Sequence, residues 1–189
     1  AHQWHRQPHH YQRQQQQQQH QVRQYSTGTD GGNQSLSHIN HSTGEPQMVD
    51  IGGKRLTARQ ATAVGRVWVG GRVCDLIAAN AIEKGQVLSV AKIAGIMAAK
   101  STAQLIPLCH QINLNNVSID TVVDREAEEV LITATAKTTW ATGVEMEALV
   151  AVSTAALTVY DMCKAVNSGI VIREIRLVAK SGGKSDMKL

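Results

Sequence analysis

The stretch TGVEMEALVAVSTAALTVYDMCKAV, residues 142–166, decides the fold because it predicts one long helix that is buried on most sides. The segment 148–159 has no ionisable side chain and holds only Ala, Leu, Val, Ser and Thr. Carboxylates precede this segment, and acidic and basic residues follow it. A core helix with charge only at its ends carries its polar groups where a rigid scaffold meets solvent, which is where functional sites are commonly built.

Each charged end of this helix has a structural interpretation and a functional one. At the start, Thr142 and Glu145 have the spacing of a capping box, in which both side chains satisfy free backbone amides. That structural role suffices for Glu145, whereas Glu147 has no part in such a box. At the end, Asp161 and Lys164 are three residues apart and therefore share a helix face, as in a surface ion pair or an acid–base pair.

Composition indicates one domain with a tail and disfavours several classes of function. A chain of 189 residues can bury a core, and with no Phe that core must be mainly aliphatic. The formal net charge of +4 suits an anionic ligand, but the basic residues are scattered and do not form the stripe of a nucleic-acid-binding protein. Three widely spaced cysteines indicate a reducing compartment. No uninterrupted apolar run reaches the roughly 20 residues of a membrane span, so we expect a soluble protein.

Residues 1–37 are predicted to be a disordered Gln/His-rich tail or linker in front of a folded domain at 38–189. The tail holds a glutamine run at 14–19, five of the eight histidines, and no acidic residue before Asp30. Such a segment cannot bury enough apolar surface to fold. Metal binding by its histidines is a disfavoured alternative, and its acid-poor, Arg-containing composition is also typical of organelle targeting.

The remaining chain predicts the element order β-α-α-β-β-α-β. Strands are expected at about 59–69, 112–123, 129–139 and 170–179, and helices at about 72–83, 88–104 and 142–166. The first helix should stop at Lys84-Gly85, and the second carries Ile93, Ile96 and Met97 at helical spacing. In the last strand, the odd positions hold the apolar residues Val171, Ile175, Leu177 and Ala179. Apart from one extra helix, this is a ferredoxin-like α+β domain, an antiparallel sheet with helices packed on one face.

Other chemistry-bearing residues lie where the predicted elements end. The GGKS sequence at 182–185 lacks the earlier glycine and the following helix of a Walker phosphate loop, so that function is excluded. Cys109 and His110 follow the apolar turn at 105–108, but neighbouring residues rarely place a thiol against its own base. His110 is better interpreted as an acid, a base or a hydrogen-bond donor. These residues alone predict an α/β domain that handles an anion by acid–base chemistry.

Several segments together make a family resemblance recognisable. They are HIN at 38–40, MVDI at 48–51, KGQVL at 84–88, AKIAGIMAAK at 91–100, LIPLCH at 105–110, KTT at 137–139, TGVEMEAL at 142–149, ALTVYDMCKAV at 156–166 and IRLVAKSGGKS at 175–185. From about residue 38 to 184 the chain resembles the MoaC family of cyclic pyranopterin monophosphate synthases, which act in molybdenum cofactor biosynthesis. On this basis residues 38–189 are predicted to be a MoaC-like catalytic domain.

The resemblance implies a lyase that rearranges 3′,8-cyclo-7,8-dihydro-GTP to cyclic pyranopterin monophosphate and releases pyrophosphate. It implies no cofactor and no metal ligand, with a magnesium ion beside the triphosphate left open. Carried over by motif, the catalytic residues are Asp161, Lys84, Lys164 and Glu145. The substrate-binding residues are Leu108, Cys109, His110, Met146, Glu147 and Lys180.

Two departures from the family pattern concern this site. Gln111 stands where the family usually has proline, which loosens the turn that aims His110. Trp140 and Ala141 stand where the family usually has glycine and a basic residue, so a cation for the triphosphate is lost there. A competing interpretation is therefore a catalytically weakened member that serves as a binding or assembly subunit.

The resemblance also implies a homo-oligomer, a hexamer built from dimers, with active sites shared between subunits. Glu147 and Asp161 lie fourteen residues apart on one predicted helix, which separates them by about 21 Å. One small substrate does not easily meet both within one chain. We expect a radical-SAM enzyme as a further partner. We expect no binding to nucleic acid or to a membrane. The expected location is the mitochondrial matrix for a eukaryotic protein and the cytoplasm otherwise.

Overall fold

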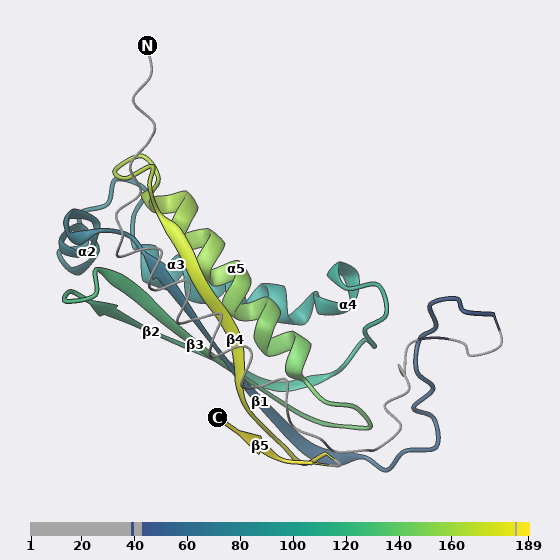
Figure 1. Ribbon diagram of the computed structural model, residues 1–189. Helices are drawn as coiled ribbons and strands as arrows, with labels where there is room; N and C mark the ends of the chain where they lie inside the picture. Colours follow the sequence, from purple (N-terminus) through teal and green to yellow (C-terminus); the bar gives the residue numbers. More distant parts are fainter. Residues whose placement is uncertain (1–38, 40–42, 184) are drawn as a thin grey trace, which may run out of the picture. The chain divides into compact units, whose positions relative to one another are not determined.

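An antiparallel sheet forms the base of the domain in the computed structural model, which describes residues 39, 43–183 and 185–189 (Figure 1). The predicted tail at 1–37 lies outside the described residues. In chain order the elements are β1 (Thr57–Trp68), α2 (Gly71–Ala78), α3 (Val87–Lys100), α4 (Thr102–Leu105), β2 (Leu114–Asp124), β3 (Glu129–Trp140), α5 (Glu145–Cys163), β4 (Val171–Ser181) and β5 (Met187–Lys188).

The strands lie in the order β2-β3-β1-β4-β5, and every neighbouring pair is antiparallel. The central strand β1 pairs with β3 on one side and with β4 on the other. Each helical connection therefore joins two strands that have a third strand between them, which is the split β-α-β plan. The expected α+β fold is confirmed, with β5 as an additional short edge strand.

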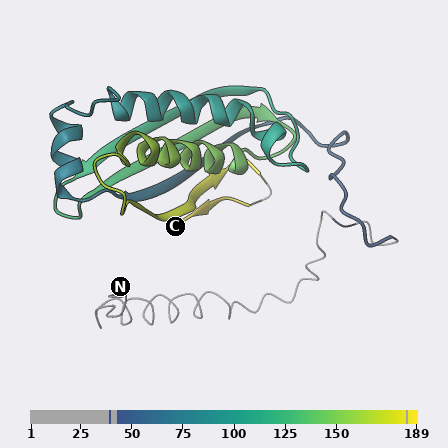
Figure 2. The same ribbon diagram turned by 90° about the horizontal axis from the view of Figure 1, so that it is seen from above.

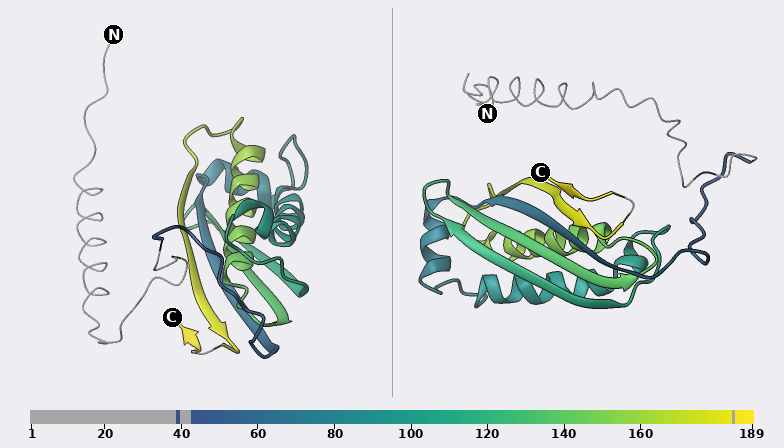
Figure 3. Two further views of the ribbon diagram at one scale, coloured as in Figure 1. Left: turned by 90° about the vertical axis from the view of Figure 1, so that its right-hand side faces the viewer. Right: turned by 90° about the horizontal axis from the view of Figure 1, so that it is seen from below.

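Helices α3 and α5 lie side by side on one face of the sheet (Figures 2 and 3). Inward-facing and outward-facing side chains alternate along β1, and the helix layer covers the inward-facing ones. Ala61, Ala63 and Val67 face the helices and are fully or almost fully buried. Gly65 on the same face leaves room for α5, since a Cβ there would stand 2.5 Å from Val152 Cγ1. Burial of a side chain such as Val152 stabilises the fold by about 1.5–3 kcal/mol.

Helix α5 is buried along most of its length, as its sequence predicts. Ten of its residues are buried, among them Glu147 at the start and Cys163 at the end. By length and composition α5 could cross a membrane, contrary to our estimate from the apolar runs, but 56% of its apolar window is buried inside the domain. We therefore interpret α5 as the core helix of this fold.

The first helix ends five residues earlier than predicted. Helix α2 stops at Ala78, and Asn80 takes a left-handed conformation with φ of 52°. The Ala81 amide then donates to the Leu76 carbonyl at 2.8 Å, which satisfies one free carbonyl of the last turn. Asn80 ends this helix, and Gly85, with φ of 100°, instead redirects the chain into α3.

The second predicted helix is divided at Ser101 into α3 and α4. The Thr102 hydroxyl donates to the Ala99 carbonyl at 2.9 Å and occupies a terminal acceptor of α3. The helical spacing of Ile93 and Met97 does not mark the buried face, since these side chains are 60% and 63% exposed. Small residues face α5 instead, and a Cβ at Gly95 would stand 2.7 Å from the Ala151 carbonyl oxygen.

Two irregularities in β4 change which side chains face the helices. The register with β1 shifts between Arg66 and Val67 and again between Thr62 and Ala63, so that one extra residue of β4 is accommodated at each place. Residues 172, 175, 177 and 180 consequently pair with the inward positions of β1. The odd-numbered apolar residues of β4 do not all face the helices, since Val171 is 48% exposed and Ala179 pairs with Thr62, an outward position of β1.

Candidate active site

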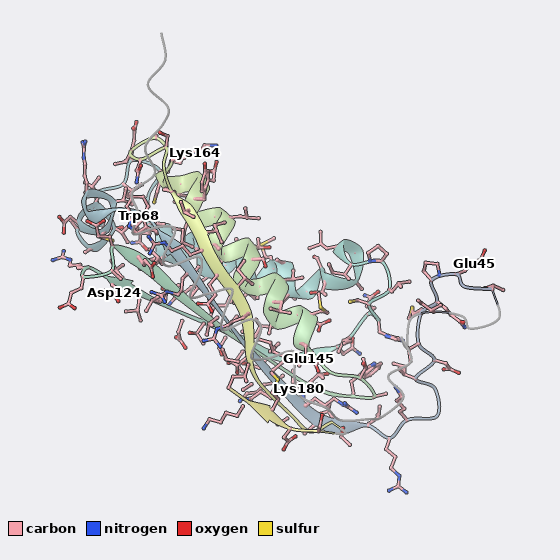
Figure 4. All side chains as sticks on the ribbon, in the orientation of Figure 1. Glu45, Trp68, Asp124, Glu145, Lys164 and Lys180 are labelled. Atoms are coloured by element: carbon pink, nitrogen blue, oxygen red, sulfur yellow. The ribbon has the colours of Figure 1, made fainter. Side chains whose placement is uncertain are left out.

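A cluster of three charged side chains lies at the C-terminal end of α5, where Figure 4 labels Lys164. The Asp161 carboxylate accepts a hydrogen bond from Lys84 Nζ at 3.0 Å and lies 2.7 Å from Lys164 Nζ. Hydrogen bonds from Lys164 and Lys84, together with their positive charges, hold the pKa of Asp161 below its ordinary value. The same contact with Asp161 raises the pKa of Lys164. The cluster therefore holds an ionised carboxylate between two ammonium groups.

The chain forms this cluster through the end of one helix and the turn before another. Lys84 lies 77 residues before Asp161 and also donates to the Asp161 backbone carbonyl at 2.9 Å. That carbonyl belongs to the last turn of α5, where acceptors lack helical partners and cations are favoured by the helix dipole. Lys84 thus caps the helix and binds its carboxylate at the same time. All three side chains are roughly half exposed and accessible to a ligand.

A second polar cluster lies at the N-terminal end of α5, where Figure 4 labels Glu145 and Lys180. The Glu145 carboxylate lies 3.4 Å from Lys180 Nζ. The predicted capping box is wrong, because the residue before the helix is Val144 and no side chain caps this end. Glu145 turns away from the free amides and toward Lys180, folding so close to Gly143 that a Cβ there would stand 1.9 Å from Oε2.

Lys180 reaches this cluster because of the second irregularity in β4. In the register, Thr62 pairs with Ala179 while Ala63 pairs with Leu177, which moves Lys180 to the position opposite Ala61 on the helix-covered face. Without the extra residue, Lys180 would point away from α5, since successive side chains in a strand alternate between faces. The bulge therefore places the Lys180 ammonium group on the helix-covered face, whereas strict alternation along β4 would place it on the opposite face.

A cavity of about 110 Å³ adjoins the Glu145–Lys180 pair. It is lined by Arg59, Gln60, Gly143, Glu145, Lys180, Ser181, Gly183 and Ser185. A guanidinium, an ammonium and two hydroxyl side chains are suitable partners for a phosphate group. The rejection of a Walker loop is confirmed, because strand β5 rather than a helix follows this segment. Lys184 lies outside the described residues.

Sequence reasoning missed Arg59, whose side chain hydrogen-bonds to the loop where the family cation is replaced. Its Nε donates to the Trp140 carbonyl at 3.0 Å and its Nη2 to the Ala141 carbonyl at 3.3 Å. Arg59 precedes Ala61 by two positions, so the alternation of β1 could have placed it on the helix-covered face. A cation therefore lies beside residues 140 and 141 although neither of them is basic.

Glu147 is a buried carboxyl group in the first turn of α5, only 4% exposed. Burial raises its pKa from 4.5 to about 7, an effect that a backbone hydrogen bond opposes and the Glu145 charge reinforces. Burial and the charge of Glu147 also raise the pKa of the Cys109 thiol, so a ready thiolate nucleophile is disfavoured here. This environment agrees with the sequence, in which a nucleophilic Cys–His pair is only weakly supported.

His110 and Glu147 line the same small cavity, of about 20 Å³, together with Lys100, Gln104 and Gln111. His110 Nε2 lies 2.8 Å from the carbonyl oxygen of Val49. The two remaining predicted binding residues, Leu108 and Met146, are half-buried in the loop before Cys109 and in the first turn of α5. Gln111, which stands where the family usually has proline, follows His110 directly and lines the same cavity as Glu147.

The predicted site residues therefore form groups at the two ends of α5 rather than one group. Asp161, Lys84 and Lys164 lie at one end, and Glu145 and Lys180 lie at the other (Figure 4). Fourteen residues of continuous helix separate Glu147 from Asp161, or about 21 Å at 1.5 Å per residue. One chain does not bring all of these residues around one small molecule.

Comparisons with known proteins identify the family. The MoaC family model matches residues 48–183. The cyclic pyranopterin monophosphate synthase of Chloroflexus aggregans is 52% identical over 155 residues, which cover 82% of this chain and 93% of that protein. The Nocardioides sp. protein of the same name is 54% identical over 151 residues, covering 79% and 92%.

A longer relative shows the same region as part of a larger protein. Molybdenum cofactor biosynthesis protein 1 of Drosophila melanogaster is 52% identical over 153 residues, which cover 81% of this chain but 27% of that protein. The chain thus spans nearly the whole length of the bacterial relatives and about a quarter of the Drosophila one. With a family match that extends over most of its length, the chain belongs to the MoaC family.

Proposed function

We propose that the chain is a cyclic pyranopterin monophosphate synthase of molybdenum cofactor biosynthesis, a lyase that converts 3′,8-cyclo-7,8-dihydro-GTP to cyclic pyranopterin monophosphate and pyrophosphate. The relatives of that name support the activity, since they match along almost their entire length at about half identity. The observation that carries the proposal is the Asp161 carboxylate held between the ammonium groups of Lys84 and Lys164.

The Asp161 cluster is suited to proton transfer. Ring opening and ring closure of the substrate need a group that accepts protons and groups that donate them. Asp161 is the acceptor, because its lowered pKa keeps it ionised near neutral pH. Lys84 and Lys164 are donors and also stabilise negative charge that develops on an oxygen atom of the substrate.

The opposite end of α5 is suited to the triphosphate. Arg59 and Lys180 border the same cavity and can neutralise phosphate oxygens. Glu145 holds Lys180 in place at 3.4 Å, and a phosphate group would replace it as the partner of the ammonium. Leu108, Cys109, His110, Met146 and Glu147 are proposed to contact the rest of the substrate.

A second subunit would unite the two ends in one site. In a twofold antiparallel contact between α5 helices, the Asp161 end of one chain meets the Glu147 end of its partner. The exposed Leu157, with 60% of its surface accessible, lies on α5 between the two ends and favours such a contact. We propose a homo-oligomer, a hexamer built from dimers, that works next to a radical-SAM enzyme supplying the substrate. The proposed location is the mitochondrial matrix for a eukaryotic source.

The test is incubation of the purified protein with the cyclised GTP intermediate. Pyrophosphate and the cyclic pterin phosphate should appear in equal amounts, as resolved by chromatography and mass spectrometry. The matched control is the same incubation with the Asp161→Asn protein. Tight binding of the intermediate without turnover would refute the enzyme assignment and favour a binding or assembly subunit.

A further inference from the structure

The residues that precede β1 form an extended arm, residues 43–56, at the same end of the domain as α4 (Figures 1 and 2). Nearly all of its side chains are exposed, and only Val49 and Ile51 are half-buried. Its hydrogen bonds are otherwise local, such as Gly52 N–H to Asp50 Oδ1 at 2.8 Å. Among the described residues, the contact between His110 and Val49 is the one hydrogen bond that joins the arm to the domain.

The geometry of that contact determines where the imidazole carries its proton. A backbone carbonyl oxygen can only accept a hydrogen bond, so His110 Nε2, 2.8 Å from the Val49 oxygen, must be the donor. In the neutral ring one nitrogen carries the proton and the other has the lone pair. Nε2–H therefore leaves Nδ1 as the basic nitrogen of His110.

This assignment matters because of the neighbours of His110. The side chain lines the same cavity as the buried carboxyl of Glu147 and the basic residue Lys100. A histidine whose Nε2 is engaged by its own chain can exchange a proton or accept a hydrogen bond only through Nδ1. The identity of the free nitrogen thus decides the direction from which a ligand must approach.

We propose that the Val49 carbonyl is a positioning group for the active site: it holds His110 as the Nε2–H tautomer, presents Nδ1 to the substrate, and fastens the arm, residues 43–56, to this end of the domain. The role at the substrate rests on the proposed function. The tautomer and the attachment of the arm are properties of the free protein and do not depend on it. They can therefore be tested separately.

The first test is nitrogen NMR of the protein labelled with ¹⁵N-histidine, at a pH well above the ordinary imidazole range. The His110 signal is identified by its disappearance in His110→Gln. We expect the coupling pattern of a ring protonated at Nε2, with Nδ1 unprotonated. A ring protonated at Nδ1 would overturn the proposal without any bearing on the enzyme activity.

The second test compares two amide substitutions that replace different ring nitrogens. The Gln side chain places its NH₂ near the former Nε2, so His110→Gln should still donate to Val49. His110→Asn is too short to do so. Hydrogen exchange at Gly52 and Lys54, whose amides donate hydrogen bonds in the arm, should accelerate about tenfold in His110→Asn and stay near the wild-type rate in His110→Gln, as expected for the loss of one hydrogen bond. Equal exchange rates in both variants would overturn the attachment of the arm.

Turnover measurements distinguish the proposed role of His110 at the substrate from its role in attaching the arm. His110→Gln keeps the arm in place but has no basic nitrogen, so we expect kcat to fall by at least about a hundredfold while the exchange rates of the arm remain normal. A His110→Gln protein with normal kcat would overturn the role of Nδ1. If the wild type itself showed no turnover, the proposed function would fail while the NMR and exchange results would still decide the tautomer and the arm.

Discussion

Lys164, the residue that follows α5, places its Nζ 2.7 Å from Asp161 Oδ1, on the side of the carboxylate that Lys84 leaves free. Two ammonium groups thus engage the two oxygens of one carboxylate. Because the folded-state pKa of Asp161 is lowered, its stabilising effect is present above the unfolded pKa and is lost as the pH falls through the folded pKa. The group is exposed, so solvent screening keeps this effect small. The lowered pKa of Asp161 matters more for chemistry than for stability, since it keeps the carboxylate available as a proton acceptor at neutral pH.

Asp161→Asn should abolish turnover and leave the fold intact. The amide keeps the size of the side chain but cannot accept a proton at neutral pH, so kcat should fall by about 10²–10⁴-fold. Asp120→Asn, at an exposed position on β2, is the matched control and should retain wild-type activity. Steady-state kinetics and thermal melting check both variants. If Asp161→Asn unfolds the domain or turns over normally, Asp161 is structural.

Glu147→Gln should lose activity and yet stabilise the fold at alkaline pH. The folded-state pKa of Glu147 is raised from 4.5 to about 7, so the wild type is most stable below the unfolded value and loses stability as the pH rises through that window. The full effect is about 3 kcal/mol. Gln cannot ionise, so the variant should be more stable by up to about that amount at pH 8, and not at pH 4.

Chemical denaturation at the two pH values measures this difference. Glu126→Gln, an exposed acid in the turn between β2 and β3, is the control and should leave the pH dependence of stability unchanged. A Glu147→Gln protein that unfolds at the same denaturant concentration as the wild type at pH 8 would show that Glu147 ionises as freely as a surface acid.

Gly143→Ala should weaken substrate binding through Glu145. A Cβ at residue 143 would stand 1.9 Å from Glu145 Oε2, so the carboxylate must move away from Lys180. We expect kcat/KM to fall about tenfold, equivalent to about 1.4 kcal/mol, with little change in stability because the displaced atoms end a flexible side chain. Gly53→Ala, where no atom lies within 4 Å of the new Cβ, is the control. Unchanged kcat/KM in Gly143→Ala would exclude Glu145 as the group that positions Lys180.

The sequence predicts the layer structure of this domain because burial leaves a periodic record in it. Ala61, Ala63 and Val67, at alternate positions of β1, and most of the uncharged middle of α5 are buried, as a helix layer on one face of a sheet requires. Local capping rules were less reliable. Thr142 and Gly85 match the sequence patterns of a helix start and a helix end. In the structure, Val144 precedes α5 and Glu145 contacts the distant Lys180 rather than forming a capping box. Helix α2 ends before Asn80, which takes a left-handed conformation.

The assembly of the site depends on contacts that no local pattern records. Lys84 meets Asp161 across 77 residues, and Arg59 binds the carbonyls of Trp140 and Ala141 across more than 80. Lys180 reaches Glu145 only because β4 accommodates an extra residue against β1, and the register of two strands is a property of the pair. Motif resemblance proposed Lys84 and Lys180, whereas it offered no signal for Arg59.

Deletion of residues 1–36 should leave melting temperature and activity unchanged. The segment lies outside the described residues, and the prediction comes from its composition, which cannot bury enough apolar surface to stabilise the domain. The arm, residues 43–56, is retained in this variant. Differential scanning calorimetry and the turnover assay provide the comparison. A large decrease in either quantity would show that the segment contributes to the folded domain.

A mixture of two inactive variants should regain activity if the site is shared between subunits. Glu147→Ala and Asp161→Ala each remove one end of α5, and those ends are about 21 Å apart within a chain. In a mixed dimer one interface receives the intact Glu147 of one chain and the intact Asp161 of the other, while the second interface receives both substitutions. Random exchange of equal amounts gives mixed dimers in about half the population, so about a quarter of the wild-type sites should return.

Each variant exchanged with itself is the control, and native mass spectrometry verifies that mixed oligomers have formed. Mixed oligomers without activity would mean that Glu147 and Asp161 act within one chain or that one of them does not act at all.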